Sequence, residues 1–214
     1  MKSDNKELEQ QNDVEETPKS RRRLIYEEIM SWVKPIAVAV VVALFLNHFI
    51  IVNATVPTGS MENTIQPGDR LMGNRLAYGK EKPERGDIVI FKYPVDESEN
   101  YIKRIIGLPG ETVEILHGKI YINGSPKALE EPYLKEEWVI QNDGFIFEVP
   151  EGCYLMLGDN RNNSLDARYW ADEAIRVGLA NDRDEALNYC YVSEDKILGK
   201  AMFTYWPKFS KLSD

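Results

Sequence analysis

A serine and a lysine are the residues of this chain with the clearest capacity for chemistry. Ser60 stands in a short turn that contains glycine, PTGSM, and Lys103 stands in an apolar run, YIKRII. The run predicts a strand, in which successive side chains point to opposite faces, so Lys103 shares its face with Tyr101 and Ile105. Burial beside such side chains disfavours the charged ammonium, and a neutral lysine can act as a base. The pair predicts a hydrolase with serine as nucleophile and lysine as general base.

The histidine content supports a lysine base. The chain has two histidines, of which His48 lies in an apolar run and His117 in a predicted hairpin turn. Neither is placed to serve Ser60, so a Ser-His-Asp triad is disfavoured. Holding a lysine of ordinary pKa neutral at pH 7 costs about 4.6 kcal/mol, which only a water-poor pocket can supply. Taken singly, Ser60 is also compatible with an ordinary turn serine, and Lys103 with a strand lysine whose ammonium group reaches water.

A polar block, GDNRNNSLDARYW, directly follows a predicted apolar strand. Read alone, it is compatible with a solvated loop held by Asx turns. It also brings Ser164, Asp166 and Arg168 to alternating positions, from which hydrogen-bonding groups can surround a buried amine. Asp159 or Asp166 can pair with Arg104 or Arg168, and the sequence leaves these pairings open.

The N-terminal part of the chain predicts a membrane anchor. Residues 1–31 are largely polar, with acidic and basic side chains, and we expect a disordered cytoplasmic tail. Residues 32–52 contain an apolar run close to the roughly 20 residues that a membrane helix needs, with Trp32 as an interface anchor. Lysines and arginines precede this run. The positive-inside rule therefore places the N-terminus in the cytoplasm and the rest of the chain outside.

Two alternatives compete with a retained anchor. A cleaved signal peptide also has a basic flank, but its apolar core usually covers about 7–15 residues and ends at an A-x-A-like site. The run in this chain is longer, and the sequence at 52–54, VNA, fits such a site poorly. A helix in a soluble core would need other elements to cover it, and the remaining sequence offers none.

From residue 53 onward, short β-like runs alternate with glycine and proline. They predict one extracytoplasmic catalytic domain, 53–214, of mostly β structure, folded as a coiled sheet or partly closed barrel. Within it we expect a small lobe at about 112–150 and a short helical insertion at about 171–190, where Ile and Leu recur at helical spacing. The expected strands are 87–91, 101–108, 113–116, 119–122, 145–149, 153–157 and 200–206.

Composition excludes several classes of function. The chain has 214 residues and a net charge of −9, which argues against nucleic acid as a partner. Cys153 and Cys190 lie far apart and lack metal-ligand spacing, so we expect no zinc site and infer no other metal or organic cofactor. The two cysteines are either ordinary thiols, which we favour, or one disulfide, and their spacing does not decide between these.

Five sequence blocks, in order after one N-terminal apolar run, resemble the type I signal peptidases, the membrane-bound leader peptidases with a serine–lysine dyad. The resemblance covers most of the chain, from the apolar run to Trp206. The blocks are PTGSM (57–61), GDIVIF (86–91), YIKRIIGLPG (101–110), GDNRNNSLDARYW (158–170) and ILGKA (197–201).

The resemblance implies a role for each candidate residue. Ser60 is then the nucleophile and Lys103 the general base. The Ser60 backbone N–H and the Thr58 hydroxyl are expected to form the oxyanion hole. The expected lysine-orienting and supporting residues of the polar block are Ser164, which would hydrogen-bond the amine, Asp166 and Arg168.

The resemblance also implies a reaction. The chain is expected to be a single-pass serine endopeptidase of the cell membrane, with its catalytic domain on the outer face. It would remove signal peptides from exported pre-proteins, cutting after small residues, so its partners are pre-proteins and the lipid bilayer. The substrate would bind as an added strand, with shallow pockets lined by Val56, Met61 and Ile102. Asn63 stands where the family usually has proline, which removes a backbone constraint and puts the rigidity of the turn in doubt.

Two other functions compete with this one. A self-cleaving or regulatory serine–lysine protease of related fold would share the dyad, but the closeness of the span to Ser60 favours substrates held in the membrane. A membrane-tethered β domain that binds a partner and cleaves nothing belongs to a different class. A cleavage assay on a precursor separates the two.

Overall fold

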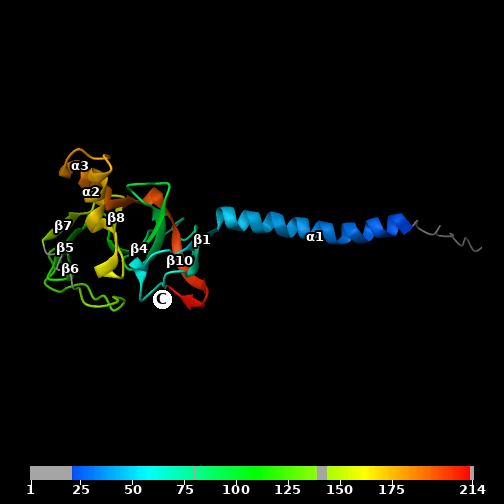
Figure 1. Cartoon of the computed structure of the whole chain (residues 1–214), viewed down its shortest axis with the longest axis horizontal. Coiled ribbons are helices and arrows are strands. Elements are labelled where there is room, and N and C mark those ends of the chain that lie inside the picture. Colours follow the sequence, from blue (N-terminus) through cyan, green and yellow to red (C-terminus); the bar gives the residue numbers. More distant parts are fainter. Residues whose placement is uncertain (1–20, 80, 139–143, 213–214) are drawn as a thin grey trace, which may run out of the picture. The chain divides into compact units, whose positions relative to one another are not determined.

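The computed structural model describes residues 21–79, 81–138 and 144–212. The chain divides into two units, residues 1–44 and 45–214. Most of one long helix belongs to the first unit, and all the strands belong to the second (Figure 1).

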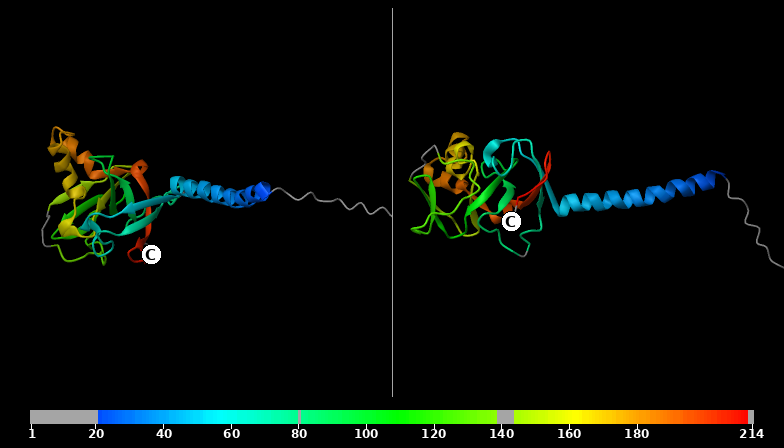
Figure 2. Two further views of the ribbon diagram at one scale, coloured as in Figure 1. Left: turned by 45° about the vertical axis from the view of Figure 1, so that its right-hand side comes forward. Right: turned by 90° about the horizontal axis from the view of Figure 1, so that it is seen from below.

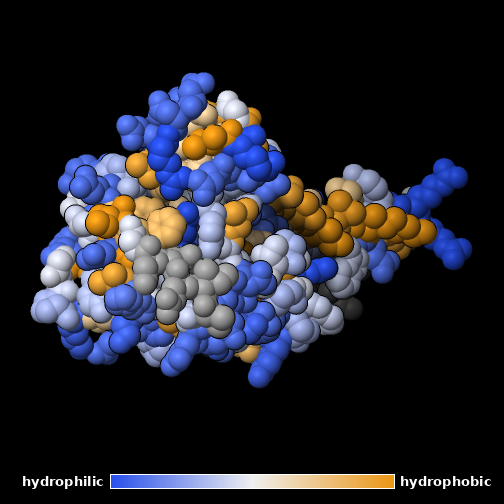
Figure 3. All heavy atoms as spheres, turned by 60° about the vertical axis from the view of Figure 1, so that its left-hand side comes forward, coloured by the Kyte–Doolittle hydropathy of each residue, from blue (hydrophilic) through white to orange (hydrophobic). Residues whose placement is uncertain are grey.

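α1 (Arg21–Phe49) is a single helix without a buried residue. It is long and apolar enough to cross a membrane, and the part of its surface visible in Figure 3 is mostly apolar. Residues 21–31, expected in a disordered tail, are helical instead, because a helix extends readily into neighbouring residues of good helix propensity such as Arg, Leu, Met and Glu. The expected tail at 1–20 lies outside the described residues. The helix ends at Phe49 rather than at residue 52, because the chain from Ile51 pairs as a strand.

The second unit is built on an eight-stranded sheet with the order β1-β2-β10-β3-β4-β8-β9, in which β11 pairs with β10. Neighbouring strands are antiparallel, and the sheet curls strongly (Figure 2) without closing into a ring. The strands are β1 (Ile51–Thr55), β2 (Arg70–Asn74), β3 (Ile88–Lys92), β4 (Asn100–Gly107), β8 (Cys153–Leu157), β9 (Tyr191–Ser193), β10 (Ile197–Trp206) and β11 (Ser210–Lys211).

A smaller sheet has the order β6-β5-β7 and falls within the expected lobe. Its strands are β5 (Thr112–Leu116), β6 (Lys119–Ile122) and β7 (Phe145–Glu148). β5 and β6 form a hairpin, whose two-residue turn places His117 and Gly118 at φ values of 50° and 68°. Positive φ at both central residues is the geometry that suits the twist of a tight hairpin.

The helical insertion consists of α2 (Ala167–Arg176), α3 (Arg183–Leu187) and the 3-10 turn η3 (Asn188–Cys190). α2 begins before the expected residue 171 because the Asp166 side chain caps it by accepting from the Arg168 N–H. Three further 3-10 turns are η1 (Gly59–Met61), η2 (Arg161–Asn163) and η4 (Glu194–Lys196).

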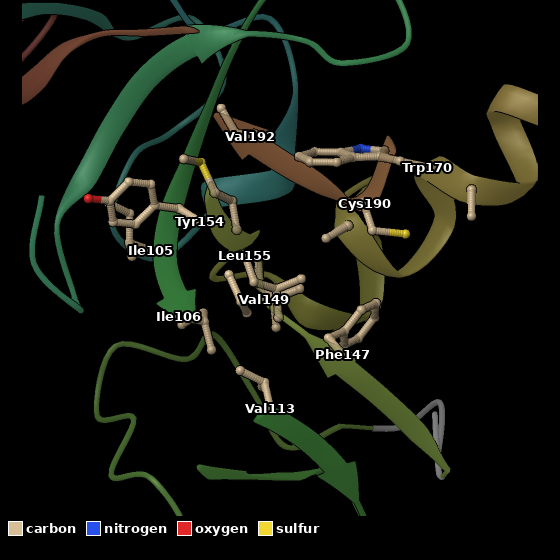
Figure 4. Close-up of a cluster of buried hydrophobic side chains, with 14 of the residues drawn as sticks. Ile105, Ile106, Val113, Phe147, Val149, Tyr154, Leu155, Trp170, Cys190 and Val192 are labelled. Atoms are coloured by element: carbon tan, nitrogen blue, oxygen red, sulfur yellow. The ribbon is translucent and has the colours of Figure 1, made fainter. Parts of the chain in front are cut away.

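Two hydrophobic clusters fix these elements. The larger one joins the main sheet, the small sheet and the insertion (Figure 4), with Ile105 and Tyr154 from the main sheet and Trp170 from α2. The smaller one lies under β1–β3 and holds Met61 and Ile65, both fully buried, which anchors the segment around Ser60.

The expectation of a mostly β fold with a coiled sheet and a short helical insertion is confirmed. Four strands were not expected: β1, β2, β9 and β11. β1 overlaps the apolar run assigned to the membrane, and β2 is short, mixed in polarity and interrupted by glycine. Cys153 and Cys190 are free thiols, in agreement with the favoured interpretation.

Candidate active site

A cleft of about 690 Å³ opens between two parts of the main sheet. One side is formed by residues 53–61, which continue from β1 into the Ser60 turn, and the other by residues 99–103 at the start of β4. Asn163 and Leu165 of the polar block also line it. Ser60 and Lys103, distant in sequence, therefore face the same space.

Both strands beside the cleft have an unpaired edge. β1 pairs with β2, and residues 100–103 of β4 pair with β3, whereas β8 pairs with β4 only from Arg104 onward. Within the described ranges, no further strand occupies the other edge of β1 or of this half of β4. An extended peptide in the cleft therefore meets free backbone groups on both sides.

The Ser60 turn, residues 58–65, presents the serine on a 3-10 turn. The Met61 and Ile65 side chains are buried below it, and the Ile65 N–H donates to the Met61 carbonyl at 2.8 Å. The Ser60 side chain itself points into the cleft region, where the residue is 7 % exposed. A short turn fixed by buried neighbours leaves the Ser60 backbone little freedom to move.

Lys103 meets Ser60 directly. Its Nζ lies 2.7 Å from Ser60 Oγ and 3.1 Å from the Ile102 carbonyl oxygen. The residue is 4 % exposed, and burial lowers its pKa to about 8, although the charges of Asp166 and Asp159 act in the opposite direction. A substantial fraction of the amine is thus neutral in mildly alkaline solution, and the neutral amine can accept the Ser60 proton.

Thr58 lies at the open side of this pair. Its Oγ1 donates to Ser60 Oγ over 3.4 Å, which is a long contact. A hydroxyl held so weakly can turn toward another acceptor in the cleft. Its position is compatible with the expected oxyanion-hole role.

The polar block is fixed by two buried ion pairs. Arg104 donates to both carboxylate oxygens of Asp159, at 2.8 and 2.6 Å. Arg168 donates to both oxygens of Asp166, at 2.8 and 2.9 Å, and the Gly158 N–H donates to the same carboxylate at 3.0 Å. Burial by itself raises the pKa of Asp166, but the Arg168 charge and these hydrogen bonds outweigh it and hold the pKa below its usual value. The structure thereby selects one pairing among those that the sequence left open.

Ser164 is placed differently from the expectation. It is 6 % exposed, and its buried Oγ makes no hydrogen bond to Lys103 Nζ. The hydroxyl packs on Gly158, where an added Cβ would come within 2.2 Å of it. The expected hydrogen bond to the lysine is absent because Nζ is directed to Ser60 and to the Ile102 carbonyl instead.

The expected substrate-pocket residues do come together. Val56, Met61 and Ile102 all line the cleft next to the dyad and are 3 %, 0 % and 9 % exposed. Asp166 and Arg168 do not line it and instead support the polar block from behind.

Two residues near the site, Asn160 and Glu131, were given no role in the sequence analysis. Asn160 binds the backbone of the Ser60 turn, because its N–H donates to the Ser60 carbonyl at 3.0 Å and its amide donates to the Gly59 carbonyl at 2.9 Å. Its place in the polar block was the one feature of the sequence that could have indicated this contact. Glu131 forms a buried ion pair with Arg161, and nothing in the pattern around Glu131 indicated it.

Comparisons with known proteins agree over most of the chain. The family model described as signal peptidase, peptidase S26, matches residues 29–206. A probable signal peptidase I-2 of Synechocystis is 34% identical, over 92% of this chain and 82% of its own. Signal peptidase IB of Staphylococcus aureus is 32% identical, over 85% of this chain and 91% of its own. A crystal structure of a signal peptidase I from Enterococcus faecalis, 32% identical, covers 56% of this chain and 97% of its own with a TM-score of 0.42.

Proposed function

The chain belongs to the signal peptidase family, peptidase S26, and we propose that it removes signal peptides from exported pre-proteins with Ser60 and Lys103 as its catalytic dyad. The observation that carries the dyad is the 2.7 Å contact between Lys103 Nζ and Ser60 Oγ inside a cleft. The lowered pKa of the buried amine supports the same assignment.

The chemistry uses the dyad twice. Ser60 Oγ attacks the scissile carbonyl carbon while Nζ of neutral Lys103 takes the hydroxyl proton, and Lys103 then gives that proton to the leaving amine. Water then attacks the acyl carbon while losing a proton to Lys103, and Lys103 passes that proton to Ser60 Oγ as the acyl–oxygen bond breaks, which releases the carboxylic acid product and restores both residues. The Ser60 N–H and the Thr58 hydroxyl stabilise the oxyanion of each tetrahedral intermediate, a contribution worth about 3–4 kcal/mol for one donor in other enzymes.

Specificity for small residues follows from the apolar side chains that line the cleft. The substrate adds as a strand to the unpaired edges of β1 and β4, and its alternate side chains point toward Val56, Met61 and Ile102. These side chains are nearly fully buried, so they leave shallow pockets that accept small side chains before the cleavage point.

α1 supplies the membrane anchor in this proposal. Its length and apolar composition fit one crossing, and Arg21, Arg22 and Arg23 stand at its start. By the positive-inside rule that end faces the cytoplasm. The catalytic domain is then outside the cell membrane, where exported pre-proteins emerge with their signal peptides still in the bilayer.

A cleavage assay tests the function. We expect the full chain in detergent micelles or liposomes to cut a precursor that has alanine just before the cleavage point, and to leave uncut the same precursor with a bulky residue there. Ser60→Ala is expected to remove cleavage, because the nucleophile is lost. If the unaltered protein cuts no precursor but binds it, the chain is a binding module rather than a peptidase.

The pH dependence of this reaction tests the base. Since the pKa of Lys103 is lowered to about 8 and the neutral amine is the active form, kcat/KM is expected to rise with pH and level off above pH 8. Below that point, the rate is expected to fall about tenfold per pH unit as the amine becomes protonated. A profile that stays flat from pH 6 to 10 would exclude Lys103 as the base.

A further inference from the structure

The 131–138 loop, which follows β6 (green in Figure 1), reaches the Ser60 turn and the polar block. It belongs to neither sheet, yet Glu131 forms its ion pair with Arg161 almost fully buried. On the side of the turn, Lys135 Nζ donates to Glu62 Oε2 at 2.9 Å. The loop is therefore attached both to the polar block and to the segment that carries the nucleophile.

Asn63 joins the Ser60 turn to the backbone of the loop. Its Nδ2 donates to the Tyr133 carbonyl at 3.1 Å and approaches the Leu134 carbonyl at 3.4 Å. Its backbone has a φ of 97°, which proline cannot adopt because its ring fixes φ near −65°. Non-glycine residues keep such a backbone only where their surroundings hold it there, and such residues cluster at functional sites.

The other restraints on the turn act from different sides. Met61 anchors it to the core from below, Asn160 binds the Ser60 carbonyl from the polar block, and the Thr64 hydroxyl donates to Asp159 at 2.5 Å. On the side of the 131–138 loop, the contacts to the turn come from Asn63 and from the surface pair of Glu62 with Lys135. Asn63 thus restrains the turn through its side-chain hydrogen bonds, at the position where related proteins usually have proline.

We propose that Asn63 is a positioning residue, whose amide ties the Ser60 turn to the 131–138 loop and thereby keeps Ser60 Oγ at hydrogen-bond distance from Lys103 Nζ. The inference rests on the proposed function, because it concerns the geometry of that dyad. The sequence analysis put the rigidity of this turn in doubt, because asparagine lacks the fixed φ of proline. In this proposal the hydrogen bonds of the Asn63 amide restrain the turn instead. Since a misplacement of about 1 Å can cost about 100-fold in rate, a loosened turn should be visible in kcat.

Asn63→Asp isolates the amide donor. Aspartate has the same size and tolerates positive φ nearly as well as asparagine, but its carboxylate cannot donate to the carbonyls of Tyr133 and Leu134. In the full-length enzyme with a precursor substrate, we expect kcat to fall about 10- to 100-fold with KM changed less than about twofold. Amide hydrogen exchange in residues 131–138 is expected to become faster.

Asn123→Asp is the matched control. Asn123 is also exposed and has positive φ, 51°, but its side chain accepts, with Oδ1 taking the Thr112 N–H at 2.9 Å. A carboxylate preserves that bond, so kcat should remain that of the unaltered enzyme. Asn63→Gly relaxes the backbone without restoring the donor and is expected to stay impaired.

The outcomes distinguish a failure of the positioning role of Asn63 from a failure of the proposed peptidase function. If Asn63→Asp or Asn63→Gly keeps the full kcat, the positioning role is wrong, whereas a precursor left uncut by the unaltered enzyme overturns the proposed function instead. If the melting temperature of Asn63→Asp falls well below that of Asn123→Asp, the loss of kcat could reflect unfolding. In that case Lys135→Met tests the attachment of the turn to the loop. That exposed change removes the second contact to the turn, and it should lower kcat in the same direction; an unchanged kcat contradicts the proposal.

Discussion

Lys103→Met is expected to lower kcat by about 10⁴-fold, near the upper end of what a positioned acid–base group contributes. Methionine has a similar length and fits an apolar pocket, but it cannot take the proton of Ser60 Oγ, which now lies 2.7 Å from the amine. The measurement is single-turnover cleavage of a precursor. The double variant with Ser60→Ala should be no slower than either single one, because residues that act as a unit are not additive.

The same substitution is expected to leave the fold intact or to stabilise it. The folded state lowers the pKa of Lys103 from 10.5 to about 8, so the unfolded chain holds the extra proton between those two values. Stability therefore falls as the pH drops from 10.5 to 8, by about 3 kcal/mol in total, and methionine removes this cost. Lys119→Met, an exposed strand lysine of the small sheet, is the control. A Lys103→Met protein that is inactive because it has unfolded would contradict the expectation.

Asp166→Asn is expected to be the most destabilising of the changes considered. It leaves the fully buried Arg168 guanidinium without its counter-charge, and breaking a buried pair from one side costs about 3–5 kcal/mol. For a domain of this size that corresponds to a fall of roughly 6–20 °C in the melting temperature. Thermal unfolding of the full chain in detergent, followed by circular dichroism, measures it.

The control for this change is Glu173→Gln, which breaks a surface pair with Arg176 on α2 and should leave the melting temperature nearly unchanged. Combining Asp166→Asn with Arg168→Met removes both charges and is expected to recover part of the loss. The lowered pKa of Asp166 also sets a direction with pH: its stabilising contribution is present above its unfolded pKa of 3.8 and is lost as the pH falls further. A single variant as stable as the unaltered chain would show that the pair does not hold the polar block.

The sequence was sufficient for the elements whose pattern is strong. The apolar strands β3, β4 and β8 and the β5–β6 hairpin lie close to the expected ranges, because periodicity and turn residues determine them locally. β2 could not be found in this way, since its short run of mixed polarity becomes a strand through pairing with β1 and β10. Its strand state is a property of the tertiary fold.

Within the site, residue types predicted the pair of Ser60 and Lys103 and the supporting residues Asp166 and Arg168, but not the other contacts around them. Lys103 was indicated because neither histidine was suitably placed and because the residues around the lysine are apolar. In the structure its Nζ contacts Ser60 Oγ. The direction of the Ser164 hydroxyl depends on its packing against Gly158, which lies beyond what spacing can show. Glu131 lies in a loop without periodicity and Asn63 contacts the same loop, so these contacts become visible only when the chain is folded.

The unpaired edges of β1 and β4 also bear on how products leave. A peptide that binds as a strand keeps its backbone hydrogen bonds after its chain has been cut. The fragment that was bound to Ser60 as the acyl group therefore has to dissociate before the next substrate binds. Where such departure is slower than bond cleavage, release sets the turnover rate. In the proposed binding mode, the backbone groups that hold the substrate would thus also set how long the cleft stays occupied by the cut fragment.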